Sequence, residues 1–130
     1  MKTFKVHLPW VAWIIMVFII MGIPGNYFPQ IITLVDILSP DKIVHFFLFG
    51  VFVFLLLRSF MKQYTLVNRS YIVSGALFFG IFVGALTELL QHYVFVGRNG
   101  NIYDFLADAI GCLIGMSAYM ISRRKKIVKS

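Results

Sequence analysis

Four long apolar runs dominate the chain, and short polar or proline-containing stretches separate them. A membrane-spanning helix needs about 20 mostly apolar residues to cross roughly 30 Å of hydrocarbon. The runs that meet this requirement cover about residues 9–28, 42–60, 70–96 and 102–122. The pattern predicts a single all-α domain over residues 1–130, an integral membrane protein with four transmembrane helices.

The amino-acid composition favours the same class of protein. Hydrophobic residues make up 60% of the chain and charged residues 13%, against roughly 45–50% apolar and 25% charged in soluble domains. A soluble fold of this length could not bury so much apolar surface. The net charge of +7 would be a reason to consider nucleic acid as a partner, but the placement of the charges has another explanation.

The basic residues are concentrated in alternate connecting segments: before the first predicted span, between the second and third, and after the fourth. Three segments hold ten basic residues and no acidic one: Lys2, Lys5, Arg58, Lys62, Arg69, Arg123, Arg124, Lys125, Lys126 and Lys129. All five acidic residues lie elsewhere. Basic loops stay on the cytoplasmic side during membrane insertion. We therefore expect both termini in the cytoplasm and no nucleic-acid partner.

Glycines in the last two spans recur at a helix-packing interval. The third span contains Gly80-x3-Gly84 and the fourth contains Gly111-x3-Gly115. Small residues at this spacing let two helices approach closely in lipid. Because a short turn joins these spans, the pattern predicts that they form a tightly packed antiparallel pair.

Ionisable residues inside membrane spans are costly and usually mark a functional site. Here they gather toward the predicted outer ends of the spans: Asp41, Lys42 and His45 in the second, Glu88, Gln91 and His92 in the third, and Asp104 and Asp108 in the fourth. Spacings of three or four residues put the members of each group on one helix face. Arg98, in the turn between the last two spans, is a candidate counter-charge. The pattern predicts one polar pocket that opens to the outer side.

Three sets of roles follow for these residues. The expected ligand-binding residues are Asp41, Lys42, His45, Glu88, Gln91, Arg98, Asp104 and Asp108. If the protein is an enzyme, the expected catalytic residues are His45, Glu88 and His92, with a histidine as general base. A divalent metal is an open alternative, with Glu88, His92, Asp104 and Asp108 as the candidate ligands.

The same residues resemble the VanZ-like family in order and spacing. The resemblance rests on Asp41-Lys42-x2-His45-Phe46, Gly84-x3-Glu88-x2-Gln91 with Arg98, and Asp104-x3-Asp108-x2-Gly111-x3-Gly115. The family usually has an asparagine where this chain has Asp108, which adds a carboxylate beside Glu88. The resemblance implies a multi-pass protein of the bacterial cytoplasmic membrane, acting in the cell envelope. It also implies an association with resistance to teicoplanin, a glycopeptide antibiotic with a lipid tail.

Three functions are compatible with these features. The first is binding of an amphiphile in the outer leaflet, with membrane lipids or a lipid-linked envelope precursor as partners. The second is a membrane-embedded hydrolase or transferase of a lipid phosphate or ester, with or without a metal. The third is a proton-coupled lipid transporter, because buried carboxylates often relay protons. The sequence identifies no established enzymatic activity and leaves the oligomeric state open.

Overall fold

Four helices make up the part of the chain that the computed structural model describes, namely residues 2–23, 40–95 and 100–127. They are α1 (Lys2–Met21), α2 (Pro40–Gln63), α3 (Arg69–Tyr93) and α4 (Ile102–Ile127). All four are long and apolar enough to cross a membrane. The all-helical class and the number of spans predicted from the apolar runs are therefore confirmed.

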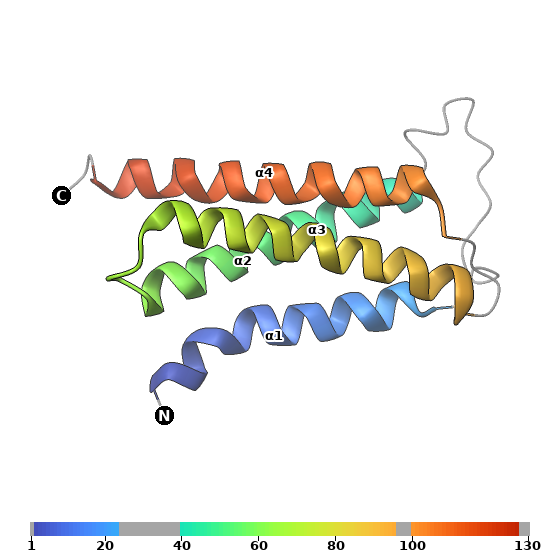
Figure 1. The fold of residues 1–130 in the computed structure, drawn as a ribbon, viewed down its shortest axis with the longest axis horizontal. Helices are drawn as coiled ribbons and strands as arrows, with labels where there is room; N and C mark the ends of the chain where they lie inside the picture. Colours follow the sequence, from blue (N-terminus) through green and yellow to red (C-terminus); the bar gives the residue numbers. More distant parts are fainter. Residues whose placement is uncertain (1, 24–39, 96–99, 128–130) are drawn as a thin grey trace.

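The helices run along the long axis of the molecule in alternating directions (Figure 1). Both ends of the chain consequently lie at one end of the bundle, and the α2 N-terminus, the α3 C-terminus and the α4 N-terminus lie at the other. The charge pattern predicts that both termini lie on the same side of the membrane, and this arrangement of the helices agrees with that prediction. Which side of the membrane that end faces stays a prediction.

The helix boundaries differ from the expected spans most clearly at the start of the first helix and the end of the last. The first helix begins at Lys2 instead of residue 9 and carries Pro9 within it. The last helix continues to Ile127, beyond the expected end at residue 122. Basic residues at helix ends are polar enough to leave the hydrocarbon, so the helical segment is longer than the apolar run that identifies it. The expected extension of the first span past residue 23 lies outside the described residues.

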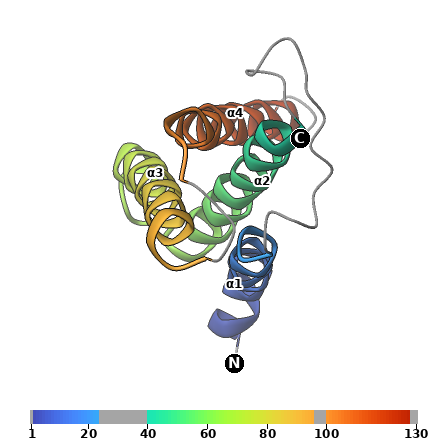
Figure 2. The same ribbon diagram turned by 90° about the vertical axis from the view of Figure 1, so that its right-hand side faces the viewer.

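Helix α2 occupies the centre of the bundle, and the view along the helices shows α1, α3 and α4 arranged around it (Figure 2). Phe49, Phe52, Leu56 and Leu57 of α2 are almost completely buried. Helix α1 joins this core partly through Trp13, whose indole N–H donates a hydrogen bond to the Leu48 carbonyl over 2.9 Å. Phenylalanines on the outside of the bundle remain exposed, as suits side chains that face lipid.

The closest helix pair is α2 with α4, so the prediction that the third and fourth spans form the tightest pair is wrong. A Cβ atom added at Gly115 would collide with the Gly50 carbonyl oxygen, and one added at Gly111 with the Phe46 carbonyl oxygen. The two α4 glycines therefore lie against the α2 backbone. Their partner, Gly50, is a single glycine outside any G-x3-G pattern.

The α3 glycines face the seam between α2 and α4. A Cβ atom at Gly80 would lie 2.6 Å from Val53 of α2 and 2.9 Å from the Cys112 sulfur of α4. One at Gly84 would lie 3.0 Å from the Cβ atom of Asp108. Helix α3 thus approaches both neighbours, and its second glycine makes room for a carboxylate.

Candidate functional site

The first turns of α2 supply one wall of the site. Pro40 begins the helix and Asp41 follows in its first turn, where a carboxylate interacts favourably with the helix dipole. His45 lies one turn further along, on the same face as Asp41. Its side chain is completely buried, so the imidazole must find its polar partners inside the bundle.

His45 meets Asp108 of α4, which is also completely buried. The Nδ1 atom of His45 lies 2.9 Å from Oδ1 of Asp108. A neutral imidazole that donates its Nδ1–H to this carboxylate keeps a lone pair on Nε2. That atom is then able to accept a proton or to bind a cation.

Glu88 of α3 reaches the same imidazole and also the start of α4. Its Oε1 atom lies 3.7 Å from His45 Nδ1, and its Oε2 atom accepts a 2.8 Å hydrogen bond from the backbone N–H of Asn101. The Asn101 side chain accepts a hydrogen bond from the Tyr103 N–H and so caps α4. Glu88 thereby fixes the position of α3 relative to the α4 N-terminus.

Asp104 lies one turn before Asp108 on α4 and faces α2. Its Oδ1 atom is 3.6 Å from the ammonium nitrogen of Lys42. Both side chains are largely buried, so this ion pair is screened less than one at a water-exposed surface. The ammonium group of Lys42 thus compensates part of the negative charge at this end of the bundle.

These contacts bring five residues together into what we call the acid–histidine cluster: Asp41, His45, Glu88, Asp104 and Asp108. One ligand atom each from Asp41, His45 and Asp104 lie within 4.8 Å of one another. The same holds for His45, Glu88 and Asp108, so His45 belongs to both triads. The arrangement offers imidazole and carboxylate ligands for a cation, or a histidine that a carboxylate orients as a general base.

Several buried polar atoms of the cluster have no hydrogen-bond partner among the described protein atoms. They are His45 Nε2, Glu88 Oε1, Asp104 Oδ1 and Asp108 Oδ2. Buried polar groups in proteins are nearly always hydrogen-bonded, to protein or to water, and exceptions call for an explanation. A cluster with such atoms on three helices is equipped to hold something besides its own side chains.

Three other candidate residues lie apart from the cluster or beyond the described segments. Gln91 is buried, but its side-chain amide donates to the carbonyl oxygen of Met21, the last residue of α1, over 3.3 Å. His92 is exposed and stacks edge-on against Tyr93. It belongs to neither of the two triads. Arg98 lies outside the described residues.

A groove between α3 and α4 connects Glu88 with the outside of the bundle. Its volume is about 470 Å³, and it is lined by Ala85, Glu88, Leu89, His92, Tyr93, Gly100, Asn101, Ile102 and Phe105.

Asn101 was not among the residues singled out from the sequence. Its place just before a helix, three residues ahead of Asp104, is typical of an N-cap, but its contact with Glu88 depends on the tertiary packing.

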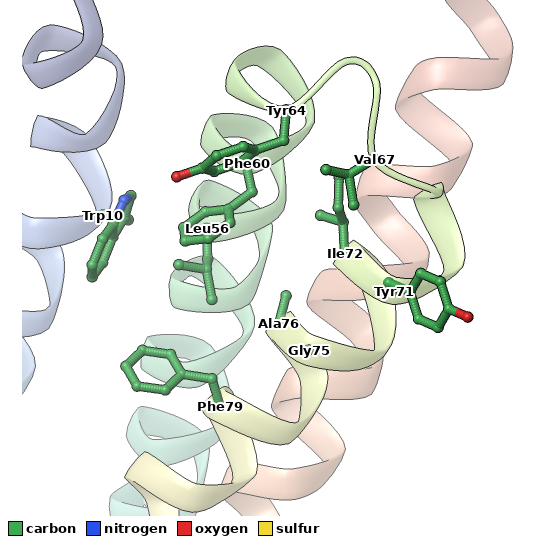
Figure 3. Close-up of a pocket in the computed structure, with 10 residues that line it drawn as sticks. All are labelled: Trp10, Leu56, Phe60, Tyr64, Val67, Tyr71, Ile72, Gly75, Ala76 and Phe79. Carbon is green, nitrogen blue, oxygen red and sulfur yellow. The ribbon is translucent and has the colours of Figure 1, made fainter.

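A second cavity of about 470 Å³ lies toward the other end of the bundle, between α1, α2 and α3 (Figure 3). Aromatic and aliphatic side chains such as Trp10, Leu56, Phe60 and Phe79 surround it. The ten described residues that line it include no carboxylate and no imidazole. This cavity offers no ligands for a metal and no acid–base pair, so the chemistry of the described chain is concentrated at the acid–histidine cluster.

Comparison with known proteins gives one result for the family. The VanZ/LLP1 family model matches residues 7–123 of the 130-residue chain, which includes the whole cluster and most of every helix. Neither a curated protein nor a solved structure matches the chain.

Proposed function

This chain belongs to the VanZ-like family, and from this premise we propose that it binds an amphiphilic or lipid-linked ligand of the bacterial cell envelope. The ligand enters from the outer leaflet of the cytoplasmic membrane. Resistance to teicoplanin, the lipid-tailed glycopeptide associated with the family by resemblance, is the phenotype we connect with this binding.

The position of Glu88 is the observation that carries the proposal. Its side chain lines the groove between α3 and α4 and also lies beside His45 in the buried cluster. A ligand in the groove therefore has a direct polar route to the cluster. Binding sites for small molecules are typically apolar grooves in which a few polar groups converge.

The groove lining suits a molecule with a polar and an apolar part. Leu89, Ile102 and Phe105 supply apolar surface for a hydrocarbon chain, whereas His92 and Asn101 supply polar groups for a head group. Lipid chains already surround a protein of this class, so a ligand that diffuses in the leaflet can reach the groove from the side.

The outer-leaflet location is supported by the distribution of charge between the two ends of the bundle. Lys5, Arg58 and Lys62 gather around one small surface pocket near the N-terminus. The cluster is formed near the α2 N-terminus, the α3 C-terminus and the α4 N-terminus, which lie at the opposite end of the bundle (Figure 1). If the basic end is cytoplasmic, the cluster and its groove face outward.

The proposal is tested by measuring lipid retained on the protein purified in mild detergent, using native mass spectrometry. Leu89→Trp places a larger side chain in the groove, and we expect it to lose the ligand that the wild type retains. Leu86→Trp is the matched control, because Leu86 is also exposed on α3 but does not line the groove. Equal retention by both variants would contradict the proposed binding site.

A second candidate function is favoured by the contact between His45 and Asp108. A histidine oriented by a carboxylate is the usual form of a general base, and the buried pair has this geometry. The protein would then act on a phosphate or ester bond of the bound lipid. Turnover of a lipid phosphate or ester that disappears in Glu88→Gln, with lipid retention unchanged, would favour the enzyme over the binding protein.

The geometry gives less support to proton-coupled transport. A proton relay across the membrane requires polar groups at successive depths. The buried carboxylates and histidine of the described residues all lie at the end of the bundle that holds the cluster. We therefore keep ligand binding as the proposed function.

A further inference from the structure

We infer that His45, Glu88 and Asp108 form a binding site for a divalent transition-metal cation. The inference goes beyond the proposed lipid binding and does not depend on it, because a cation site can exist with or without an amphiphile in the groove. It rests on the distances between the three side chains, on their burial and on the charge around them.

The distances between the three side chains fit a shared cation. His45 Nδ1 lies 2.9 Å from Asp108 Oδ1 and 3.7 Å from Glu88 Oε1. Two ligands bound about 2.1 Å from one metal ion are about 3.0 Å apart at a right angle and about 3.4 Å apart at a tetrahedral angle. Coordination requires the tautomer with the imidazole proton on Nε2, in which Nδ1 carries the lone pair. In that tautomer, small side-chain adjustments bring all three atoms into coordination distance.

Burial gives an independent reason for a ligand at this place. His45 and Asp108 are completely buried, and Glu88 is 9% exposed. Asp108 Oδ2 and Glu88 Oε1 have no hydrogen-bond partner among the described protein atoms. Charged carboxylates in a low-dielectric interior need compensation, and a cation coordinated by these oxygens supplies it.

The charge around the two triads distinguishes between them. Asp104 already lies beside the ammonium group of Lys42, which would repel a metal ion placed among Asp41, His45 and Asp104. The triad of His45, Glu88 and Asp108 has two carboxylates whose combined charge matches that of one divalent ion. The cation is therefore assigned to the triad that does not include Asp104, the partner of Lys42.

The chemistry of the three ligands limits which ions fit the site, and the groove provides a way in. One imidazole with two carboxylates suits Zn²⁺ or Mn²⁺ better than Ca²⁺ or Mg²⁺, which favour all-oxygen sites. Glu88 lines the groove between α3 and α4, so an ion can reach the triad from there. Gly84 leaves room for Asp108, because a Cβ atom at that position would lie 3.2 Å from the carboxylate oxygen Oδ2.

A bound cation would also resolve a difficulty in the proposed function. An anionic head group such as a phosphate is repelled by Glu88 and Asp108 when both are charged. A divalent ion between them would neutralise the two carboxylates and could itself bind phosphate oxygens. The metal would then link the buried cluster to the ligand in the groove.

The test is metal binding by the full-length chain, purified in mild detergent and treated with a chelator. Zn²⁺ and Mn²⁺ are added separately, and bound metal is counted by elemental analysis after gel filtration. We expect one ion per chain on the wild type. Glu88→Gln and Asp108→Asn should each weaken binding by more than about tenfold, whereas the matched control Asp104→Asn should bind as the wild type does.

Two results would overturn the inference. The first is a wild type that retains neither ion, a measurement that needs no variant and so is unaffected by misfolding. The second is loss of the ion in Asp104→Asn with full binding in Glu88→Gln, which would place the cation in the other triad. Lipid retention measured on the same samples separates the two proposals, since metal without lipid contradicts the proposed function alone.

Discussion

The imidazole of His45 and the carboxylate of Asp108, 63 positions apart in the sequence, lie 2.9 Å from each other in the buried interior. The contact joins the start of α2 to α4, next to the place where Gly111 and Gly115 pack against the α2 backbone. It fixes the orientation of the imidazole, and it makes the packing of α2 on α4 a condition for an intact site.

Two substitutions of Asp108 test separately how much its hydrogen bond to His45 and its negative charge contribute to stability. Asp108→Asn keeps an acceptor oxygen for the His45 N–H, so the variant should unfold at nearly the wild-type temperature. Asp108→Leu leaves a buried imidazole without its partner, which costs about 1–3 kcal/mol. Thermal unfolding in detergent measures both, with Ser117→Ala at an exposed α4 position as the control. An Asp108→Leu variant as stable as the wild type would contradict a stabilising role for this contact.

The packing of α2 on α4 predicts an asymmetry between two glycine substitutions. Gly115→Ala places a methyl group against the Gly50 carbonyl oxygen, and overpacking of this kind costs about 1–3 kcal/mol. Gly75→Ala meets no atom within 4 Å, so it should be neutral or slightly stabilising, because alanine favours helix. The two midpoints of thermal unfolding test this directly. A harmless Gly115→Ala would be incompatible with the close approach of these helices.

The predicted topology can be checked with single cysteines and a thiol reagent that does not cross membranes. The native Cys112 is completely buried and should give no background. Leu66→Cys, in the fully exposed link between α2 and α3, should react only after the cells are permeabilised. Tyr103→Cys, at the start of α4, should react in intact cells. The reverse pattern would place the acid–histidine cluster on the cytoplasmic side.

The proposed link to teicoplanin is tested in a susceptible bacterium that expresses the protein. The wild type should raise the teicoplanin concentration that stops growth, relative to the empty vector. Glu88→Gln should abolish the increase, because it removes the carboxylate that joins the groove to the cluster. Leu86→Trp serves as the control for expression and membrane insertion. Protection by Glu88→Gln equal to that of the wild type would show that the cluster has no part in the phenotype.

Helical periodicity predicted much of the fold but not the pairing of the helices. Apolar length identifies spans regardless of tertiary contacts, so all four helices could be read from the sequence. Periodicity also placed Asp104 and Asp108 on the face that carries Gly111 and Gly115. It states which residues share a face, however, and not which helix that face meets. Gly50 is a single small residue with no repeated pattern, so nothing in the sequence marked α2 as the partner of α4.

The same limit applies to the candidate site. Glu88, Gln91 and His92 share one side of α3 by spacing, but the buried stripe of that helix runs through Gly84, Glu88 and Gln91. His92 lies about 100° around the helix from Gln91 and is exposed at the groove. Gln91 is directed to the end of α1, a contact that depends on how the first helix packs. Asn101 acquires its role only because the α4 N-terminus lies beside Glu88.

The most direct test of the ligand site is a binding titration with defined amphiphiles, followed by native mass spectrometry in buffer that contains Mn²⁺. Polyprenyl phosphate and the matching polyprenol differ only in the head group. The wild type should prefer the phosphate, and Glu88→Gln should bind both lipids equally, because the chain still occupies the groove while the head group loses its route to the cluster. An unchanged preference for the phosphate in Glu88→Gln would contradict the assignment of the acid–histidine cluster as the site that recognises the ligand.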